Sequence, residues 1–174
     1  LICNPSNPTG SVIPRETLEA LVELARRRSI FLIVDEVYRE FVFDAERATS
    51  VLEISGSEEV AIVIDSVSKR YSACGARIGW LVLRREDLGA AALKYLQMRL
   101  SASTLEQRAL VRVLDEGESD IQRAKQEYAR RRDVVFHLLQ TEGIPCGYPA
   151  GALYLITDIG VDAEAFTQFM LKDY

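Results

Sequence analysis

The first half of the chain shows helical and strand-like patterns of apolar positions in turn. After Pro14, apolar residues recur at helical spacing from Leu18 to Ala25, which predicts an amphipathic helix. Three short apolar runs are predicted to be strands, at residues 30–34, 60–64 and 78–83. Each run is too short for a core helix and too apolar for a half-exposed strand, which favours buried strands of a parallel sheet. Helix-length segments between such strands indicate the α/β fold class.

The second half of the chain is predicted to be mostly helical. Helices are expected over residues 87–100, 104–116 and 120–142. The last of these is highly charged and ends before Gly143. Further along, a new strand is expected over residues 152–156 and a new helix over residues 162–171.

The long charged helix predicts the domain organisation, because its length suits a connecting strut better than a core element. The expected division is a first domain over residues 1–119, a connecting helix and linker over 120–149, and the start of a second domain over 150–174. The chain opens in a strand-like segment without an initiator Met and closes in a helix-like segment. We therefore expect it to be an interior piece of a longer protein.

Composition narrows the classes of function. The chain has 174 residues, of which 48% are hydrophobic and 27% charged, and its formal net charge is −5. These values are typical of a globular protein and exclude disordered, collagen-like and coiled-coil classes. The negative net charge argues against a nucleic-acid partner, and the longest apolar run is far too short to cross a membrane. Three scattered cysteines without a CxxC pair indicate a reducing, cytoplasmic setting and no metal site.

Candidate chemistry lies where the predicted strands end. Asp35 follows the first apolar run, and Ser66, Ser68 and Lys69 follow the second. Ligands of open α/β sheets bind beyond the carboxyl ends of the strands, so these side chains are expected at one edge. The loop over residues 4–10 follows the strand-like opening of the chain and is expected at the same edge. Its two prolines and one glycine make it stiff, which suits an asparagine held in a fixed position.

Three segments resemble those of a known family: NPSNPTG at residues 4–10, DEVY at 35–38 and SVSKRYSACGARIGW at 66–80. In this order they resemble the signature segments of fold-type I pyridoxal-phosphate (PLP) enzymes, specifically class I, aspartate aminotransferase-like enzymes. The resemblance covers essentially the whole chain. It implies part of a mostly parallel large domain that binds PLP, a long connecting helix and the start of an α+β small domain.

The resemblance also implies an activity. The intact parent would move an amino group from an amino acid, with aspartate as one candidate, to a 2-oxo acid in a two-stage reaction on PLP. It would be a homodimer. In this family an arginine late in the small domain binds the substrate α-carboxylate, and it lies beyond this chain. We therefore expect the chain alone to be inactive.

Four residues receive catalytic or ring-binding roles from the resemblance. Lys69 would form the Schiff base with PLP and later carry a proton, which requires its amine to be neutral part of the time. Asp35 would pair with the pyridine nitrogen and keep it protonated. Tyr38 and Asn7 would donate hydrogen bonds to the phenolic oxygen and favour its ionised form.

The same resemblance implies a phosphate site. Arg77 would hold the phosphate with its guanidinium, and Ser66 would add a hydroxyl. Ser68 would bind the cofactor or only support Lys69. The chain departs from many relatives at Cys74, where they carry a proline, and a small cysteine in that turn is expected to leave the reaction unchanged.

Other interpretations stay open. The parent could be a lyase, synthase or decarboxylase of the same fold, or a transcription regulator that senses ligands with an aminotransferase-like domain. Asp35 alone could cap a helix, and Lys69 alone could be a surface lysine. A Ser-His-Asp triad is not supported, because the single histidine, His137, lies among apolar helix positions and no GxSxG motif occurs.

Overall fold

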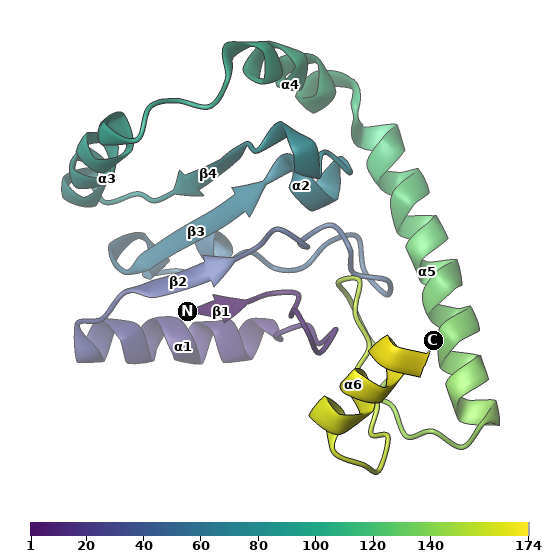
Figure 1. The fold of residues 1–174 in the computed structure, drawn as a ribbon. Helices are drawn as coiled ribbons and strands as arrows, with labels where there is room; N and C mark the ends of the chain where they lie inside the picture. Colours follow the sequence, from purple (N-terminus) through teal and green to yellow (C-terminus); the bar gives the residue numbers. More distant parts are fainter. Residues whose placement is uncertain (174) are drawn as a thin grey trace.

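The computed structural model describes residues 1–173 and contains one four-stranded sheet at its centre (Figure 1). Its strands are β1 (Ile2–Cys3), β2 (Leu32–Asp35), β3 (Ala61–Ser66) and β4 (Gly79–Val82), in the spatial order β1-β2-β3-β4. The first three strands are parallel, and β4 runs antiparallel to β3. The α/β class and a mostly parallel sheet are therefore confirmed.

The third apolar run was wrongly predicted as a buried parallel strand. The segment between β3 and β4 contains only α2 (Val67–Arg70) and the 3-10 turn η3 (Cys74–Ala76). The four residues of α2 rise about 6 Å, whereas the six residues of β3 span about 20 Å. The connection therefore has no helix long enough to carry the chain back along the sheet, and β4 returns antiparallel. It is also only half-buried, because no strand covers its outer edge among residues 1–173.

Helix α1 (Arg15–Arg28) covers one face of the sheet and confirms the helix predicted after Pro14. Its apolar side, with Leu18 and Val22 fully buried, packs against Val34 of β2 and Val63 of β3. Two 3-10 turns, η1 (Val51–Glu53) and η2 (Ser57–Glu59), complete this layer. The strand predicted over residues 30–34 starts two residues too early. Ile30 and Phe31 lie about half-exposed in the turn before β2.

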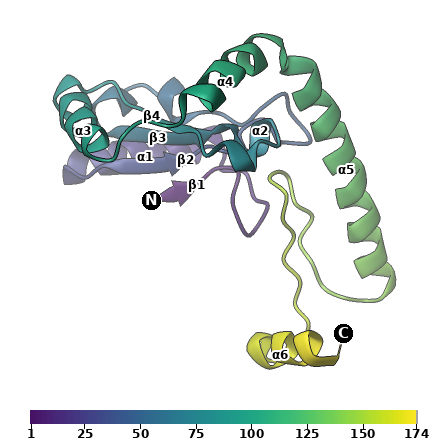
Figure 2. The same ribbon diagram turned by 45° about the horizontal axis from the view of Figure 1, so that its top comes forward.

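The second half of the chain is helical, as predicted, in α3 (Glu86–Met98), α4 (Thr104–Glu116), α5 (Glu118–Thr141) and α6 (Ala163–Asp173). In Figure 1 the long helix α5 runs down one side of the molecule, and Figure 2 shows α6 set apart from the sheet. Neither α3 nor α4 has a fully buried residue. The closing residue of the chain, Tyr174, lies outside the described residues.

The strand predicted over residues 152–156 is wrong. This segment has no strand in the described residues, and only single bridges flank it, Val42 with Gly151 and Cys146 with Thr157. A strand needs a neighbouring strand for its backbone N–H and C=O groups, and residues 1–173 contain none beside this segment. Its apolar pattern therefore reflects packing against the loop after β2.

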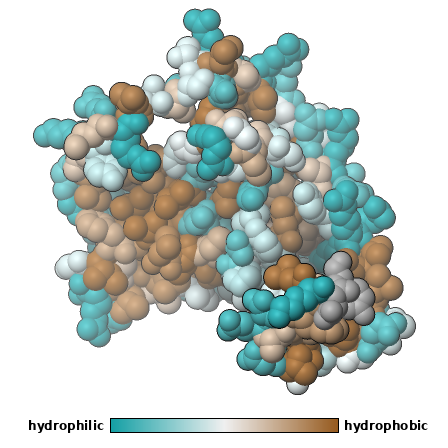
Figure 3. All heavy atoms as spheres, in the orientation of Figure 1, coloured by the Kyte–Doolittle hydropathy of each residue, from teal (hydrophilic) through white to brown (hydrophobic). Residues whose placement is uncertain are grey.

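The other face of the sheet is largely bare. Figure 3 shows apolar residues gathered on one face of the molecule. On this face of the sheet, Ile64 of β3 is 36% and Leu81 of β4 is 43% exposed. Among residues 1–173, no helix combines the length and the hydropathy that a membrane span requires.

Candidate functional site

The candidate residues gather at one edge of the sheet. Because β1, β2 and β3 are parallel, their carboxyl ends lie together, and backbone bonds join them there. Asn4 N–H donates to Asp35 O at 2.9 Å, and Glu36 N–H donates to Ile64 O at 2.9 Å. Strand β4 is antiparallel and starts opposite Ser66, so Arg77, which precedes it, reaches the same edge. A parallel β4 would place Arg77 at the opposite edge.

A cavity of about 430 Å³ at this edge brings three of the candidates together. Ser66, Ser68 and Arg77 line it, and Ile64 and Leu81 form part of its apolar wall. The hydroxyl of Ser66 caps α2 by accepting from Ser68 N–H at 3.2 Å. Its own proton remains available to a ligand.

Arg77 has an unusual backbone for a non-glycine residue. Its φ is 54°, in the left-handed region, and one guanidinium N–H donates to Cys74 O at 2.8 Å. Within residues 1–173 no carboxylate pairs with this guanidinium. Its remaining N–H groups can therefore bind an anion in the adjoining cavity.

Lys69 and Asp35 lie at the ends of neighbouring elements and do not line this cavity. Lys69 is half-buried in α2, and no ion pair involves its amine within the described part of the chain. Asp35 closes β2, where its Oδ1 accepts from Val37 N–H at 3.1 Å. This bond orients the carboxylate, and its other oxygen has no protein hydrogen-bond partner within residues 1–173.

The loop that carries Asn7 is fixed by a different asparagine. Asn4 is buried, and its Oδ1 accepts from Ile13 N–H at 2.8 Å while its Nδ2 donates to Thr49 O at 3.4 Å. Asn7 is exposed at the tip of the loop. The structure therefore ties down the base of this loop and leaves the predicted amide donor open to a ligand.

Tyr38 is almost fully buried in a small cluster with Phe41 and Ala152. Its hydroxyl is hydrogen-bonded to the hydroxyl of Tyr154, which comes from the segment after α5. Burial raises the pKa of Tyr38 above its ordinary value, and the bond with Tyr154 adds to the rise. Tyr38 therefore stays protonated and can act as a donor at physiological pH.

A network of ion pairs fixes α2, the helix that carries Lys69, to neighbouring elements. Arg70, the residue after Lys69, donates to Asp65 Oδ2 at 2.5 Å and to Glu40 Oε2 at 2.9 Å. Its guanidinium also lies over the Trp80 ring, 5.9 Å from the centroid. Burial raises the pKa of Asp65, and the positive charge of Arg70 opposes that rise. The network joins α2 to the end of β3 and to the loop after Tyr38.

Tyr154 and Arg70 are not among the site residues predicted from the sequence. Arg70 lies inside the segment over residues 66–80, but a surface arginine has the same local pattern. Tyr154 lies 116 residues beyond Tyr38, and no local pattern signals such a contact. The three-dimensional contacts alone identify both residues.

Comparison with known proteins decides the family. The family model "Aminotransferase class I and II" matches residues 1–174, the whole chain. The chain belongs to this family. The Bacillus subtilis protein YugH, whose name assigns it as an aminotransferase, is 34% identical over 98% of the chain and 45% of its own length. The aspartate aminotransferase of Thermotoga maritima is 33% identical over 99% of the chain and 45% of its own length.

Solved aminotransferase structures have the same fold. The aromatic aminotransferase of Pyrococcus horikoshii matches 99% of the chain and 48% of its own, with a TM-score of 0.91 and 29% identity. The Thermotoga maritima structure matches 99% of the chain with a TM-score of 0.89 and 31% identity. The chain is thus similar to part of these aminotransferases and spans less than half of their length.

Proposed function

We propose that the parent of this chain is a PLP-dependent aminotransferase that moves an amino group from an amino acid to a 2-oxo acid. The observation that carries the proposal is the single sheet edge to which β2, β3 and β4 bring Asp35, Lys69 and Arg77. A lysine, a carboxylate and an unpaired guanidinium at one edge suit a cofactor that has an aldehyde, a ring nitrogen and a phosphate.

The residues present fit this cofactor. Ser66 and Ser68 offer hydroxyls and Arg77 offers N–H groups, so the cavity of about 430 Å³ presents donors to a phosphate. Asp35, whose carboxylate is oriented by Val37 N–H, suits a protonated ring nitrogen. Tyr38 and Asn7 supply donors for the phenolic oxygen.

When bound, PLP supplies an aldehyde and a ring that accepts electrons. Asp35 would hold a proton on the ring nitrogen by its negative charge, and Lys69 would carry the proton that the reaction moves. Tyr38 and Asn7 would orient the ring by donating hydrogen bonds to its phenolic oxygen. The buried cluster around Tyr38 excludes water from that side of the site.

We propose for the parent the same domain organisation that the sequence predicts. Residues 1–119 belong to the PLP-binding large domain, residues 120–149 connect, and residues 150–174 begin the small domain. We propose a homodimeric parent, with aspartate as the first amino donor to test, because the group resembled is aspartate aminotransferase-like. Because the chain spans less than half the length of its relatives, residues 1–174 alone are expected not to transaminate.

Borohydride trapping followed by peptide mass mapping tests the proposal. The full-length parent is incubated with PLP, reduced and digested, and a single adduct at Lys69 is expected. Lys125 is the internal competitor, because burial lowers the pKa of its amine and makes it more nucleophilic. Its amine donates to Ala45 O at 2.5 Å and to Glu46 O at 2.8 Å. These bonds within the fold explain the position of Lys125 without a bound cofactor.

Lys69→Ala is expected to abolish the adduct, and the matched variant Lys125→Arg is expected to leave it unchanged. Adducts spread over Lys69, Lys94 and Lys125 in the parent would refute a specific PLP site. Product analysis with aspartate and a 2-oxo acid then separates transamination from a lyase or decarboxylase reaction. Turnover by residues 1–174 alone, well above free PLP, would contradict the expected inactivity of the isolated chain.

A further inference from the structure

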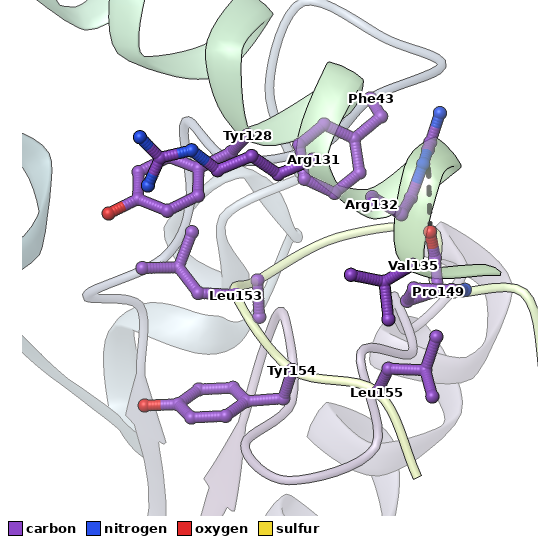
Figure 4. Close-up of a pocket in the computed structure, with 10 residues that line it drawn as sticks. Phe43, Tyr128, Arg131, Arg132, Val135, Pro149, Leu153, Tyr154 and Leu155 are labelled. Carbon is purple, nitrogen blue, oxygen red and sulfur yellow. Dashed lines mark hydrogen bonds between the residues drawn. The ribbon is translucent and has the colours of Figure 1, made fainter. Parts of the chain in front are cut away.

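Tyr154 contacts Tyr38 from a distant part of the chain. Their hydroxyls are hydrogen-bonded, and their rings meet edge to face with centroids 5.5 Å apart and planes at 87°. Tyr38 is only 2% exposed, so water has little access to its hydroxyl. Figure 4 shows Tyr154 extending from the segment after Pro149, with its hydroxyl pointing away from Leu155.

The segment that carries Tyr154 is held firmly against the sheet edge. Gly151 N–H donates to Gly10 O at 2.9 Å, and Ala152 N–H donates to Phe41 O at 2.8 Å. A Cβ on Gly10 would lie 2.5 Å from the Pro149 Cβ, and one on Gly151 would lie 2.8 Å from Phe41 O. These glycines allow three backbones to approach, so the position of Tyr154 is fixed relative to the loops of Asn7 and Tyr38.

A count of protons decides the direction of the tyrosine pair. Each tyrosine hydroxyl carries one proton and donates one hydrogen bond. In the proposed function the proton of Tyr38 is directed to the phenolic oxygen of PLP. Tyr38 can then only accept from Tyr154, and Tyr154 must be the donor.

We infer that Tyr154 is a positioning residue of the cofactor site, whose hydroxyl donates to Tyr38 and turns the Tyr38 proton toward the cofactor. The inference rests on the proposed function, because it needs PLP beside Tyr38. A hydroxyl that accepts a hydrogen bond becomes a better donor, since bonds in a chain polarise one another. Tyr154 therefore both orients and strengthens the donor at Tyr38.

The surroundings of Tyr38 favour this arrangement. The titratable groups near its hydroxyl are Cys3 from β1, Asp35 from β2 and Tyr154, and each adds to the rise in the pKa of Tyr38. Burial also raises the pKa of Cys3, which keeps its thiol neutral. Asp35 is then the acidic group that faces the Tyr38 hydroxyl from the sheet.

The test uses the PLP-loaded parent and four variants: Tyr154→Phe, Tyr38→Phe, the double variant and Tyr148→Phe. Phenylalanine keeps the ring that packs on Tyr38 and removes only the hydroxyl. The measurements are the pH midpoint of the visible absorbance of the bound cofactor and the dissociation constant of PLP. Tyr148 is the matched control, because it precedes the same segment and its hydroxyl donates at 2.9 Å to Asp133, away from Tyr38.

Tyr154→Phe is expected to raise the midpoint by about half a pH unit and to weaken PLP binding about three-fold, as for the loss of one hydrogen bond. The midpoint rises because a weaker donor at Tyr38 leaves more negative charge on the phenolic oxygen, and the cofactor keeps its proton to higher pH. In the Tyr38→Phe background the same substitution is expected to add no further shift. Tyr148→Phe is expected to change neither quantity.

Three results would overturn the inference, and they are distinguishable. A parent that shows no visible band with PLP refutes the proposed function, and the role of Tyr154 with it. A normal band with a midpoint unchanged in Tyr154→Phe refutes the role of Tyr154 alone. An equal shift with and without the Tyr38 hydroxyl also refutes it, because Tyr154 would then act independently of Tyr38.

Discussion

Replacing Arg70 by methionine tests whether the ion network beneath Lys69 stabilises the fold. Arg70, Asp65 and Glu40 have side chains that are 13%, 10% and 19% exposed, so the network is largely out of water. Methionine keeps most of the apolar stem against Trp80 and removes the charge. The substitution leaves two nearly buried carboxylates without their shared partner.

The expected loss is about 3 kcal/mol of unfolding free energy at pH 8. Removing one partner of a buried ion pair costs roughly 3–5 kcal/mol, and residual exposure places this network at the lower end. The control is Arg112→Met, which breaks an exposed pair with Glu116, whose side chains are 81% and 64% exposed. The control is expected to lose under about 1 kcal/mol.

The loss should depend on pH in a defined direction. Burial raises the pKa of Asp65, and Arg70→Met removes the charge that opposes the rise, so the folded-state pKa moves higher. A folded-state pKa above the unfolded value means that the folded protein binds the proton more tightly, so stability falls as pH rises through it. Protonation at lower pH relieves the unpaired charge, and the loss is therefore expected to be smaller at pH 5 than at pH 8.

Urea unfolding of the parent apoenzyme at both pH values measures these quantities, with tryptophan fluorescence reporting on Trp80 next to the network. A loss equal to that of Arg112→Met at pH 8 would refute the stabilising role of the network. A loss that grows toward pH 5 would refute the assignment of Asp65 as the group that carries the unpaired charge.

Two further substitutions test the packing of the fold. Leu18→Ala, at a fully buried position of α1, is expected to lower the unfolding free energy by about 3 kcal/mol, whereas Leu24→Ala on the exposed side of the same helix should cost under about 1 kcal/mol; equal losses in urea unfolding would contradict the observed burial. Gly10→Ala is expected to cost more than Gly143→Ala, although both glycines have a φ of 68°. Gly10 has no space for a Cβ, because an added Cβ would lie 2.7 Å from Tyr154 O. At Gly143 nothing lies within 4 Å of an added Cβ. Equal midpoints of thermal unfolding for the two variants would refute that contact.

Local sequence patterns predicted the helices well, because amphipathic periodicity depends on residues a few positions apart. Helix α4 has the bounds predicted for it, Thr104–Glu116, and α1 begins immediately after Pro14. The same patterns failed where the outcome depended on a neighbour. Residues 152–156 are as apolar as a strand but have no strand beside them within residues 1–173, and the run at 78–83 does not reveal the direction of β4.

The sequence by itself determined the family and the candidate chemistry. Its three signature segments carry Lys69, Asp35 and Arg77 in a recognisable order, because the short spacings within each segment depend on local geometry. What only the tertiary structure decided is how these segments meet. The antiparallel return of β4 brings Arg77 to the edge shared by Asp35 and Ser66. The close approach of the segment after α5 places Tyr154 against Tyr38, a contact across 116 residues. Such long-range contacts arise from packing of the whole chain, and no local pattern encodes them.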